Sequence, residues 1–486
     1  MKHPQAIAVT LVLVTPAFAL ADDSARLAVA LLGDTPLVRD LRSLTDEIGG
    51  RPTGSEANRR AVEWGLARFR EAGVEARAET FPMPSLWLER SASARVGGEL
   101  TFELRTAAMP FSAATPTGGL TAPLLDGGAG AEADFARLGA SAKGAFVLIA
   151  TEELVDLEGL FREYAEAAEV ERRAFAADVA GVAYMASRPK GLLYRHNVSI
   201  GPRNKRPMLI LERESAARAL RLLRSGRRLT LTASIEIEGG KPYESANVIG
   251  EIRGSEKPQE IVIVGAHLDS WDLGTGALDN GCNVALILDL ARQIHALGLH
   301  PRRTLRFALW NGEEQGMNGS WGYARAHATE LDHHVMAGSF DIGSGRITGF
   351  FTNGRPELVG VVAHSLAAVA GLGPFAQVGE PVVGTDNYDF MMEGVANLVA
   401  NQESANYGPN YHARSDTFDK VDLRQLKQNA AIAAALTWGF ATADVTWSRQ
   451  SRKEVEALVE GTTLKPQMIG MDLWDDWVAG RRGRKP

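Results

Sequence analysis

Short apolar runs alternate with longer segments of helical periodicity, and this alternation is the feature that most constrains the fold. The runs are EIVIVGAHL at 260–268, TLRFALW at 304–310 and HVMAGSFDI at 334–342. Helical periodicity fills the segments 281–298, 356–371 and 422–444. Strands that alternate with helices are typical of a mainly parallel sheet flanked by helices. The sequence therefore predicts an α/β fold for this part of the chain.

The pattern changes between residues 86 and 242. Short alternating apolar runs, such as GAFVLIATEE and RRLTLTASIEIEGG, are separated there by turns rich in glycine, alanine and threonine. This pattern is typical of a domain rich in strands. Residues 22–85 carry two helical stretches and a strand, as in the α/β part. We therefore expect one domain from 22–85 and 243–486, with 86–242 as an inserted β-rich domain.

The first 21 residues have the pattern of a signal peptide. Lys2 precedes an apolar stretch, and Ala19-Leu20-Ala21 fits a cleavage site after Ala21. This predicts a secreted or periplasmic protein with no membrane span in the mature chain. The single cysteine, Cys282, cannot form a disulfide within the chain.

Charge excludes one class of partner. The 486 residues carry a formal net charge of −7, and 45% of them are hydrophobic. Proteins that bind nucleic acids usually present a basic surface. The sequence therefore predicts no nucleic-acid partner.

Acids and histidines gather where the predicted strands end. Parallel strands place the loops after their carboxyl ends at one edge of the sheet, so these side chains are expected to lie together. Two further candidates lie in loops rich in glycine, asparagine or other polar residues. The candidates are His267, Asp269, Asp279, Glu313, Glu314, Asp341 and His412.

So many acids at one edge would repel one another unless a cation compensates them. Imidazole nitrogens and carboxylate oxygens without a thiolate suit a catalytic zinc site, and manganese or cobalt also fits. Two such ions about 3.5–4 Å apart need a bridging carboxylate. Asp279 suits the bridge because Gly276 and Gly281 let the backbone bend around it. Of the adjacent pair Glu313-Glu314, one carboxylate can bind metal while the other accepts a proton, and spacing alone leaves the assignment open.

Four ordered motifs resemble the M28 family of co-catalytic zinc peptidases. They are AHLDSWDLGTGALDNG, WNGEEQGMNGS, SFDIGSG and YHARSDTFDK. The stretch GTDNYDFMMEGVANLVAN is similar to the carboxypeptidase Q branch of that family, also called plasma glutamate carboxypeptidase. The resemblance implies a zinc exopeptidase fold, with 86–242 as a protease-associated domain.

The resemblance also implies a role for each candidate and two zinc ions per chain. Glu313 becomes the general base, and Asp269 orients the imidazole of His267. The implied zinc ligands are His267 and Asp341 for one ion, Glu314 and His412 for the other, and Asp279 for both.

The implied function is an exported di-zinc exopeptidase. It would hydrolyse dipeptides or short peptides through a metal-bridging hydroxide, and a homodimer is compatible with the family. Three alternatives remain open at this point. They are an aminopeptidase of the same family, a single-zinc acyltransferase of the glutaminyl cyclase kind, and a non-catalytic binding protein of the transferrin-receptor kind.

Four residues are candidates for substrate binding. Arg195 and Arg203 lie in the cationic loop LLYRHNVSIGPRNKRP, which suits a substrate carboxylate. Arg414 lies two residues after His412. Asp386 lies in Thr-Asp-Asn, where many family members have Ser-Asp-His, so a role for that histidine does not transfer. For the segment after residue 449, the sequence leaves open whether it packs on the body or on a partner.

Overall fold

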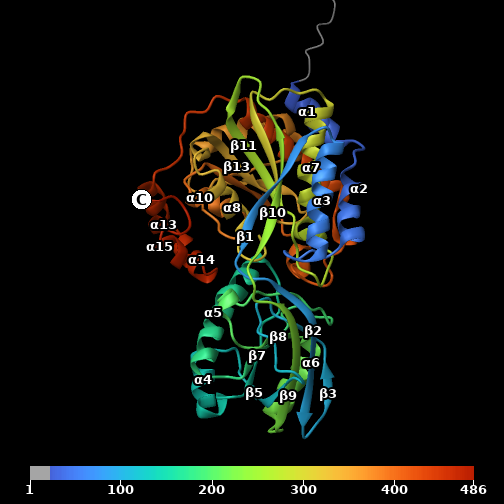
Figure 1. Cartoon of the computed structure of the whole chain (residues 1–486), viewed down its shortest axis with the longest axis vertical. Coiled ribbons are helices and arrows are strands. Elements are labelled where there is room, and N and C mark those ends of the chain that lie inside the picture. The colour runs from blue at the N-terminus through green and yellow to red at the C-terminus, as the bar shows by residue number, and fades with distance from the viewer. Residues whose placement is uncertain (1–21, 486) are drawn as a thin grey trace, which may run out of the picture.

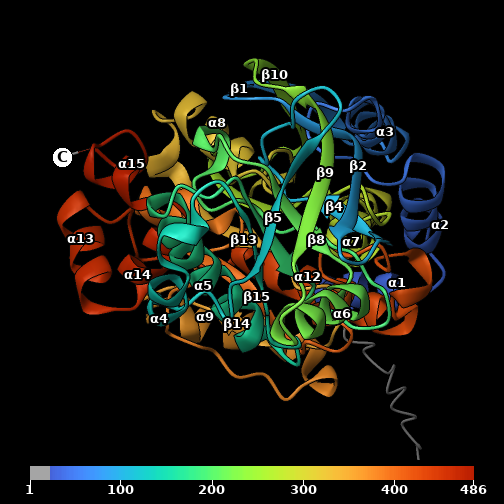
Figure 2. The same ribbon diagram turned by 90° about the horizontal axis from the view of Figure 1, so that it is seen from below.

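The structure is a computed structural model that describes residues 22–485. The predicted signal peptide lies outside these residues. The chain forms two lobes, each built around its own sheet (Figure 1). Seen from below, the strands of the insert lie in front of the larger lobe (Figure 2).

The sheet of the larger lobe is mixed. Parallel pairing is confined to its four central strands, in the order β12-β11-β13-β15, so the prediction of a mainly parallel sheet was too simple. At one edge the insertion explains this, because β1 leads out to the insert and β10 returns beside it, so the two run antiparallel. At the other edge, the last strand also pairs antiparallel with β15. The sheet order is β1 (Glu75–Met83), β10 (Tyr243–Ile252), β12 (Arg303–Trp310), β11 (Lys257–His267), β13 (His334–Ser339), β15 (Asn397–Gln402) and β14 (Ile347–Phe351).

Helices cover both faces of this sheet, because successive residues of a buried strand point to opposite sides. In β11, Val262 and Val264 face a core that includes α7 and α12, whereas Ile261 and Ile263 face a core that includes Tyr323 of α8. The helices of this lobe are α1 (Asp23–Leu32), α2 (Leu37–Arg42), α3 (Glu56–Glu71), α7 (Cys282–Ala296), α8 (Asn318–Ala326), α9 (Leu358–Ser365), α10 (Asn387–Met392), α11 (Tyr407–Asn410) and α12 (Leu423–Thr442). Short helical turns are η1 (Ser43–Ile48), η4 (Ala277–Gly281), η5 (Leu331–His333), η6 (Leu366–Leu372) and η7 (Phe418–Lys420).

The insert carries an eight-stranded sheet, but it also has helices that the sequence analysis did not predict. Its strands β5 to β8 pair in parallel, so this lobe also has α/β character. The sheet order is β3 (Phe102–Leu104), β2 (Trp87–Gly98), β9 (Leu229–Gly239), β5 (Leu120–Asp126), β6 (Phe146–Ile149), β7 (Gly181–Met185), β8 (Met208–Leu211) and β4 (Thr106–Ala108). The helical elements are α4 (Glu132–Leu138), η2 (Gly139–Ala142), α5 (Leu157–Ala176), η3 (Gly201–Arg203) and α6 (Arg213–Arg224).

The C-terminal segment ends the chain on the side of the larger lobe (Figure 1). It contains α13 (Arg452–Gly461), α14 (Leu464–Gly470) and α15 (Trp474–Val478). These helices pack on the body of the same chain through Val455, Leu464 and Trp477. In residues 22–485, every helix is too short or too polar to span a bilayer.

Candidate metal centre

The strand ends bring the predicted acids and histidines to one edge of the larger sheet. His267 ends β11 and lies beside Trp310, the last residue of β12, so the turn carrying Glu313 and Glu314 begins next to it. Gly265 lies beside Ser339 of β13, which places Asp341 on the other side. The register of three parallel strands therefore sets the spacing of the site.

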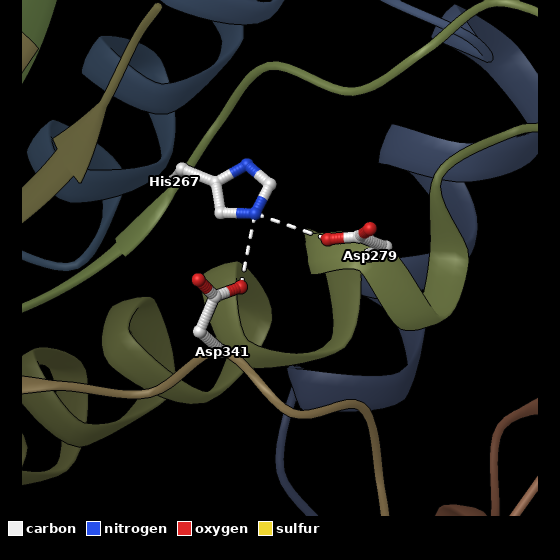
Figure 3. Close-up of side chains that lie close together, drawn as sticks. All are labelled: His267, Asp279 and Asp341. Carbon is white, nitrogen blue, oxygen red and sulfur yellow. Dashed lines mark hydrogen bonds and ion pairs between the residues drawn. The ribbon is translucent and has the colours of Figure 1, made fainter. Parts of the chain in front are cut away.

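Asp279 lies between the two histidines. Its Oδ1 is 3.1 Å from Nε2 of His267, and its Oδ2 is 3.3 Å from Nε2 of His412. Asp341 Oδ1 is 3.0 Å from the same nitrogen of His267. Figure 3 shows that Asp279 and Asp341 both point toward that nitrogen. Glu314 Oε2 is 2.8 Å from Nε2 of His412. Asp279 thus presents one carboxylate oxygen to each histidine.

These residues form two buried triads that share Asp279. In each triad the potential ligand atoms lie within 4.8 Å of one another. Glu314 Oε1 is buried and has no hydrogen-bond partner among residues 22–485, which is costly unless a cation meets it. Nitrogen and oxygen donors without sulfur suit zinc in a catalytic site. The residues present therefore fit two zinc ions.

The raised pKa values of the two histidines show that the site favours a positive charge. Burial alone lowers the pKa of His412, but Glu314 and Asp279 outweigh it and raise the pKa to about 9. Likewise, burial opposes protonation of His267, yet Asp341, Asp269 and Asp279 hold its pKa well above the usual value. The carboxylates thus attract protons onto both imidazoles, and a bound cation would take the place of those protons.

Glu313 lies beside these ligands but belongs to neither triad. It is half-buried and lines the open cleft next to Glu314. Burial raises the pKa of Glu313 well above its ordinary value, and Asp341, Asp386 and Glu314 raise it further. A carboxylate in this position suits proton transfer.

Asp269 contacts the imidazole of His267 mainly through its main chain. Nδ1 of His267 is 3.0 Å from the main-chain carbonyl oxygen of Asp269 and 3.7 Å from its carboxylate. The carboxylate instead accepts hydrogen bonds from Thr53 Oγ1, at 2.8 Å, and from the main-chain N–H of Glu313, at 3.4 Å. Asp269 thus holds the imidazole mainly through its backbone and uses its side chain to support the Glu313 turn.

The sequence analysis missed two residues that hold the loop of Asp279. Arg51 is buried and donates to the carbonyl oxygens of Leu268, Thr275 and Gly276 at 2.5, 2.8 and 3.0 Å. Asp416 accepts from the N–H groups of Ala277, Leu278 and Asp279 at 3.1, 2.6 and 3.1 Å. The available signals were the arginine inside the glycine-rich turn GGRPTGSEAN and the position of Asp416 inside the motif YHARSDTFDK.

Two glycines of the Asp279 loop have different roles. Gly276 has a φ of +61°, and a Cβ there would lie 2.3 Å from Cβ of Ser270. Gly281 has a helical φ of −54°, but a Cβ there would lie 2.7 Å from the carbonyl oxygen of Gly276. Gly276 therefore supplies the bend, whereas Gly281 is required by close approach of the backbone.

An open cleft of about 750 Å³ adjoins the triads. Both lobes and the C-terminal segment line this cleft. Its volume lies within the usual range for a small-ligand site. Tyr411 also lines the cleft, stacks on His412 with ring centroids 3.6 Å apart, and has its hydroxyl 3.3 Å from that of Tyr164 of the insert. Apolar side chains along it include Met83, Phe111, Leu160, Met317, Trp321 and Met471.

The four predicted substrate-binding residues have different locations. Arg195 is buried and pairs with Asp272 and Glu89 at 2.9 and 2.6 Å, so it joins the lobes and its guanidinium is already occupied. Arg203 is exposed, lines the cleft and pairs with Asp472 of the C-terminal segment. Asp386 is buried, which raises its pKa well above the ordinary value. Arg414 is exposed. Of the four, only Arg203 lies along the cleft.

Two buried triads that share a carboxylate, at the edge of an α/β sheet, form the arrangement that two-metal hydrolases use. The model of peptidase family M28 matches residues 247–437 of this chain, and this stretch includes all five candidate ligands. This confirms the resemblance that the four motifs indicated.

Related proteins match over most of the chain. Carboxypeptidase Q of Bos taurus is 26% identical over 407 residues, covering 82% of this chain and 84% of the bovine protein. The crystal structure of a peptidase M28 precursor from Shewanella amazonensis SB2B is 26% identical, with a TM-score of 0.79 over 87% of this chain and 97% of that one. A zinc aminopeptidase from Bacillus subtilis shares the fold, with 21% identity and a TM-score of 0.67 over 84% and 95% of the two chains.

Proposed function

We propose that this protein is a di-zinc exopeptidase that hydrolyses dipeptides or short peptides. The observation that carries the proposal is the position of Asp279, whose two carboxylate oxygens face the two histidines of separate buried triads. Two ions need a bridging carboxylate, whereas a single ion would leave one of the two buried triads without a cation, and this favours a hydrolase over a single-zinc acyltransferase. The distant relationship to carboxypeptidase Q supports the choice of short peptides.

His267 and Asp341 would hold one zinc ion, Glu314 and His412 the other, and Asp279 both. When bound there, zinc supplies Lewis acidity and makes water acidic enough to act as a nucleophile near neutral pH. The chain itself supplies the proton acceptor and the geometry that brings the substrate to it.

Glu313 is the proposed general base. Its carboxylate accepts the proton of the attacking water and returns a proton to the nitrogen of the leaving amine. Burial, and after it the neighbouring acids, raise the pKa of Glu313, which strengthens its carboxylate as a proton acceptor. The main-chain N–H of Glu313 is held by Asp269, so the carboxylate begins from a fixed backbone position.

Tyr411 is the proposed donor to the carbonyl oxygen of the scissile bond. Burial raises the pKa of its phenol well above the ordinary value, and the nearby Asp279 and Glu314 carboxylates also raise it, so the hydroxyl keeps its proton. A phenol that stays protonated beside the reaction site can donate to an oxygen that gains negative charge. Its contact with Tyr164 means that the insert helps to place this donor.

The first experiment measures zinc per chain and cleavage of a dipeptide panel with free or blocked ends, for wild type and Glu313→Gln. We expect about two zinc ions in both proteins, and a loss of turnover by several orders of magnitude only in the variant. Glu256→Gln is the matched control, because Glu256 is exposed and pairs only with Arg302 among the described residues.

The blocked substrates identify the end that is recognised. Cleavage that requires a free carboxyl end supports dipeptidase or carboxypeptidase action, whereas cleavage of carboxyl-blocked but not amino-blocked peptides would make the protein an aminopeptidase. One zinc ion per chain, or full activity of Glu313→Gln, would contradict the proposed mechanism.

A further inference from the structure

The C-terminal segment reaches the turn that carries the proposed base. Its buried residues Leu464, Met468 and Trp477 pack in one cluster with Met317, which lies four residues after Glu313. Figure 1 shows α13 to α15 beside α10, on the same side of the lobe as α8. The segment after residue 449 therefore belongs to the neighbourhood of the site.

Arg482 makes the central contact of this segment. Its side chain is buried and binds the carboxylate of Asp389 with two hydrogen bonds of 2.7 Å. The other two hydrogen bonds go to the carbonyl oxygens of Gly316, at 3.0 Å, and Met317, at 3.2 Å. The guanidinium also lies 5.1 Å from the ring centroid of Trp321, within the range of a cation–π contact.

The two carbonyl groups belong to the turn that begins at Glu313. The N–H groups of Gly316 and Met317 donate to the carbonyl oxygen of Glu313 at 2.8 and 2.9 Å. Gly316 and Met317 both have positive φ, at 103° and 56°, and for methionine this conformation is unfavourable without external support. Arg482 supplies such support, because each of these residues is hydrogen-bonded at its N–H to Glu313 and at its C=O to Arg482.

We propose that Arg482 is a positioning residue that fixes the turn of Glu313 and thereby aligns the base with the substrate. This inference rests on the proposed role of Glu313. The planar guanidinium suits the task because it can bind a carboxylate and two separate carbonyl oxygens at once, whereas a lysine ammonium is a point charge. The C-terminal segment is then a working part of the active site, and Arg482 does not touch the reacting atoms.

If Arg482 had a purely structural role, its replacement would change a different kinetic constant. If Arg482 only anchored the segment, its replacement would lower stability or raise KM, since the segment lines the cleft. If it aligns Glu313, the main effect falls on kcat, because misplacement of a catalytic group by about 1 Å can cost about a hundredfold in rate. Measuring kcat and KM therefore separates the two roles: a lower kcat indicates alignment of Glu313, and a higher KM indicates anchoring of the segment.

The test compares the full-length, zinc-loaded wild type with Arg482→Lys and Arg482→Ala, using a dipeptide that wild type cleaves. Arg452→Ala is the matched control. Arg452 belongs to the same segment, stacks 3.3 Å from the ring centroid of Trp477 and donates to the carbonyl oxygen of Arg484. Among residues 22–485 its side chain makes no hydrogen bond to the turn.

We expect kcat to fall about 10- to 100-fold in Arg482→Lys, with KM, zinc content and melting temperature close to wild type. Added guanidinium should restore part of the turnover of Arg482→Ala. Hydrogen exchange of residues 313–318 should be faster in both variants and unchanged in Arg452→Ala, and this readout does not depend on activity.

Unchanged kcat and unchanged exchange in a folded Arg482→Lys would overturn the inference, as would an effect on KM alone or one explained by lost zinc. If Arg482→Ala does not fold, the lysine variant still decides. Failure of wild type to cleave any peptide would instead contradict the proposed function, and exchange in the turn would still report on Arg482.

Discussion

The main-chain N–H of Asp279 donates to Oδ2 of Asp416 at 3.1 Å, so the proposed bridging residue is held by its backbone. The other oxygen of Asp416 accepts from the N–H groups of Ala277 and Leu278. This leaves both carboxylate oxygens of Asp279 free to face the histidines. Asp416 thus fixes the loop and leaves the carboxylate of Asp279 available for the metal ions. Groups that surround metal ligands usually orient the ligands in this way.

Replacing Asp416 by alanine should weaken metal binding. Three buried N–H groups would lose their acceptor, and the Asp279 loop would lose its fixed position. We expect the affinity for zinc to fall about 10- to 100-fold, measured by competition with a chelator. Asp419→Ala is the control, because Asp419 lies in the same region but is exposed and pairs with Lys420. Equal zinc affinity of the two variants would refute this role.

Replacing Tyr411 by phenylalanine should reduce turnover while zinc content stays the same. The substitution keeps the ring that stacks on His412 and removes only the hydroxyl that faces Tyr164. Loss of one donor to a developing oxyanion typically costs about 10²- to 10³-fold in kcat, and we expect an effect of this size. Tyr184→Phe removes a hydroxyl from a buried tyrosine of the insert and should have little effect. Similar losses in both variants would indicate a general disturbance of packing.

The sequence was sufficient to predict the candidate ligands because each follows a strand or lies in a marked loop. His267 and Asp341 follow buried apolar runs, and the parallel register of β11 and β13 brings such positions together. Four ordered motifs then made the family recognisable. Both kinds of information are local in the chain, so sequence patterns can show them.

The sequence could not show contacts made over long separations. Arg195 looked like a substrate residue because it lies in a cationic loop, but Glu89 and Asp272 neutralise it, and these residues are 106 and 77 positions away. The roles of Asp416 and Arg482 were missed for the same reason. Asp416 binds main-chain N–H groups, and Arg482 binds two main-chain carbonyl oxygens and the carboxylate of Asp389, 93 positions away. The helices of the insert were missed because its alternating apolar runs dominated the pattern.

Replacing Arg195 by alanine should destabilise the protein without a direct effect on substrate binding. Glu89 would become a partly buried charge without a partner, and Asp272, which is one-third exposed, would be partly hydrated. Removing one partner of a buried ion pair costs about 3–5 kcal/mol, and the exposure of Asp272 favours the lower end. The measurement is the free energy of unfolding in denaturant. Arg203→Ala, which breaks an exposed pair in the same loop, should cost at most about 1 kcal/mol.

Because the pKa of Glu171 is raised in the folded state, the free energy of unfolding should fall as pH rises. Its side chain is buried in the insert and accepts hydrogen bonds from the N–H and the hydroxyl of Ser199, yet burial still raises its pKa to about 7. Between the unfolded pKa of about 4.5 and this value, the folded state holds a proton that the unfolded state has lost. The unfolded state then binds fewer protons, so the free energy of unfolding decreases with rising pH.

The decrease should begin near the unfolded pKa and end above about pH 7, with a total of up to about 3 kcal/mol. Glu171→Gln is neutral throughout, so it should lose this part of the pH dependence and become more stable than wild type near about pH 8. Glu166→Gln, on the exposed side of the same helix, is the control and should follow wild type. Denaturant midpoints at about pH 5 and about pH 8 provide the comparison, and parallel curves for all three proteins would show that Glu171 is ionised in the folded state at both values.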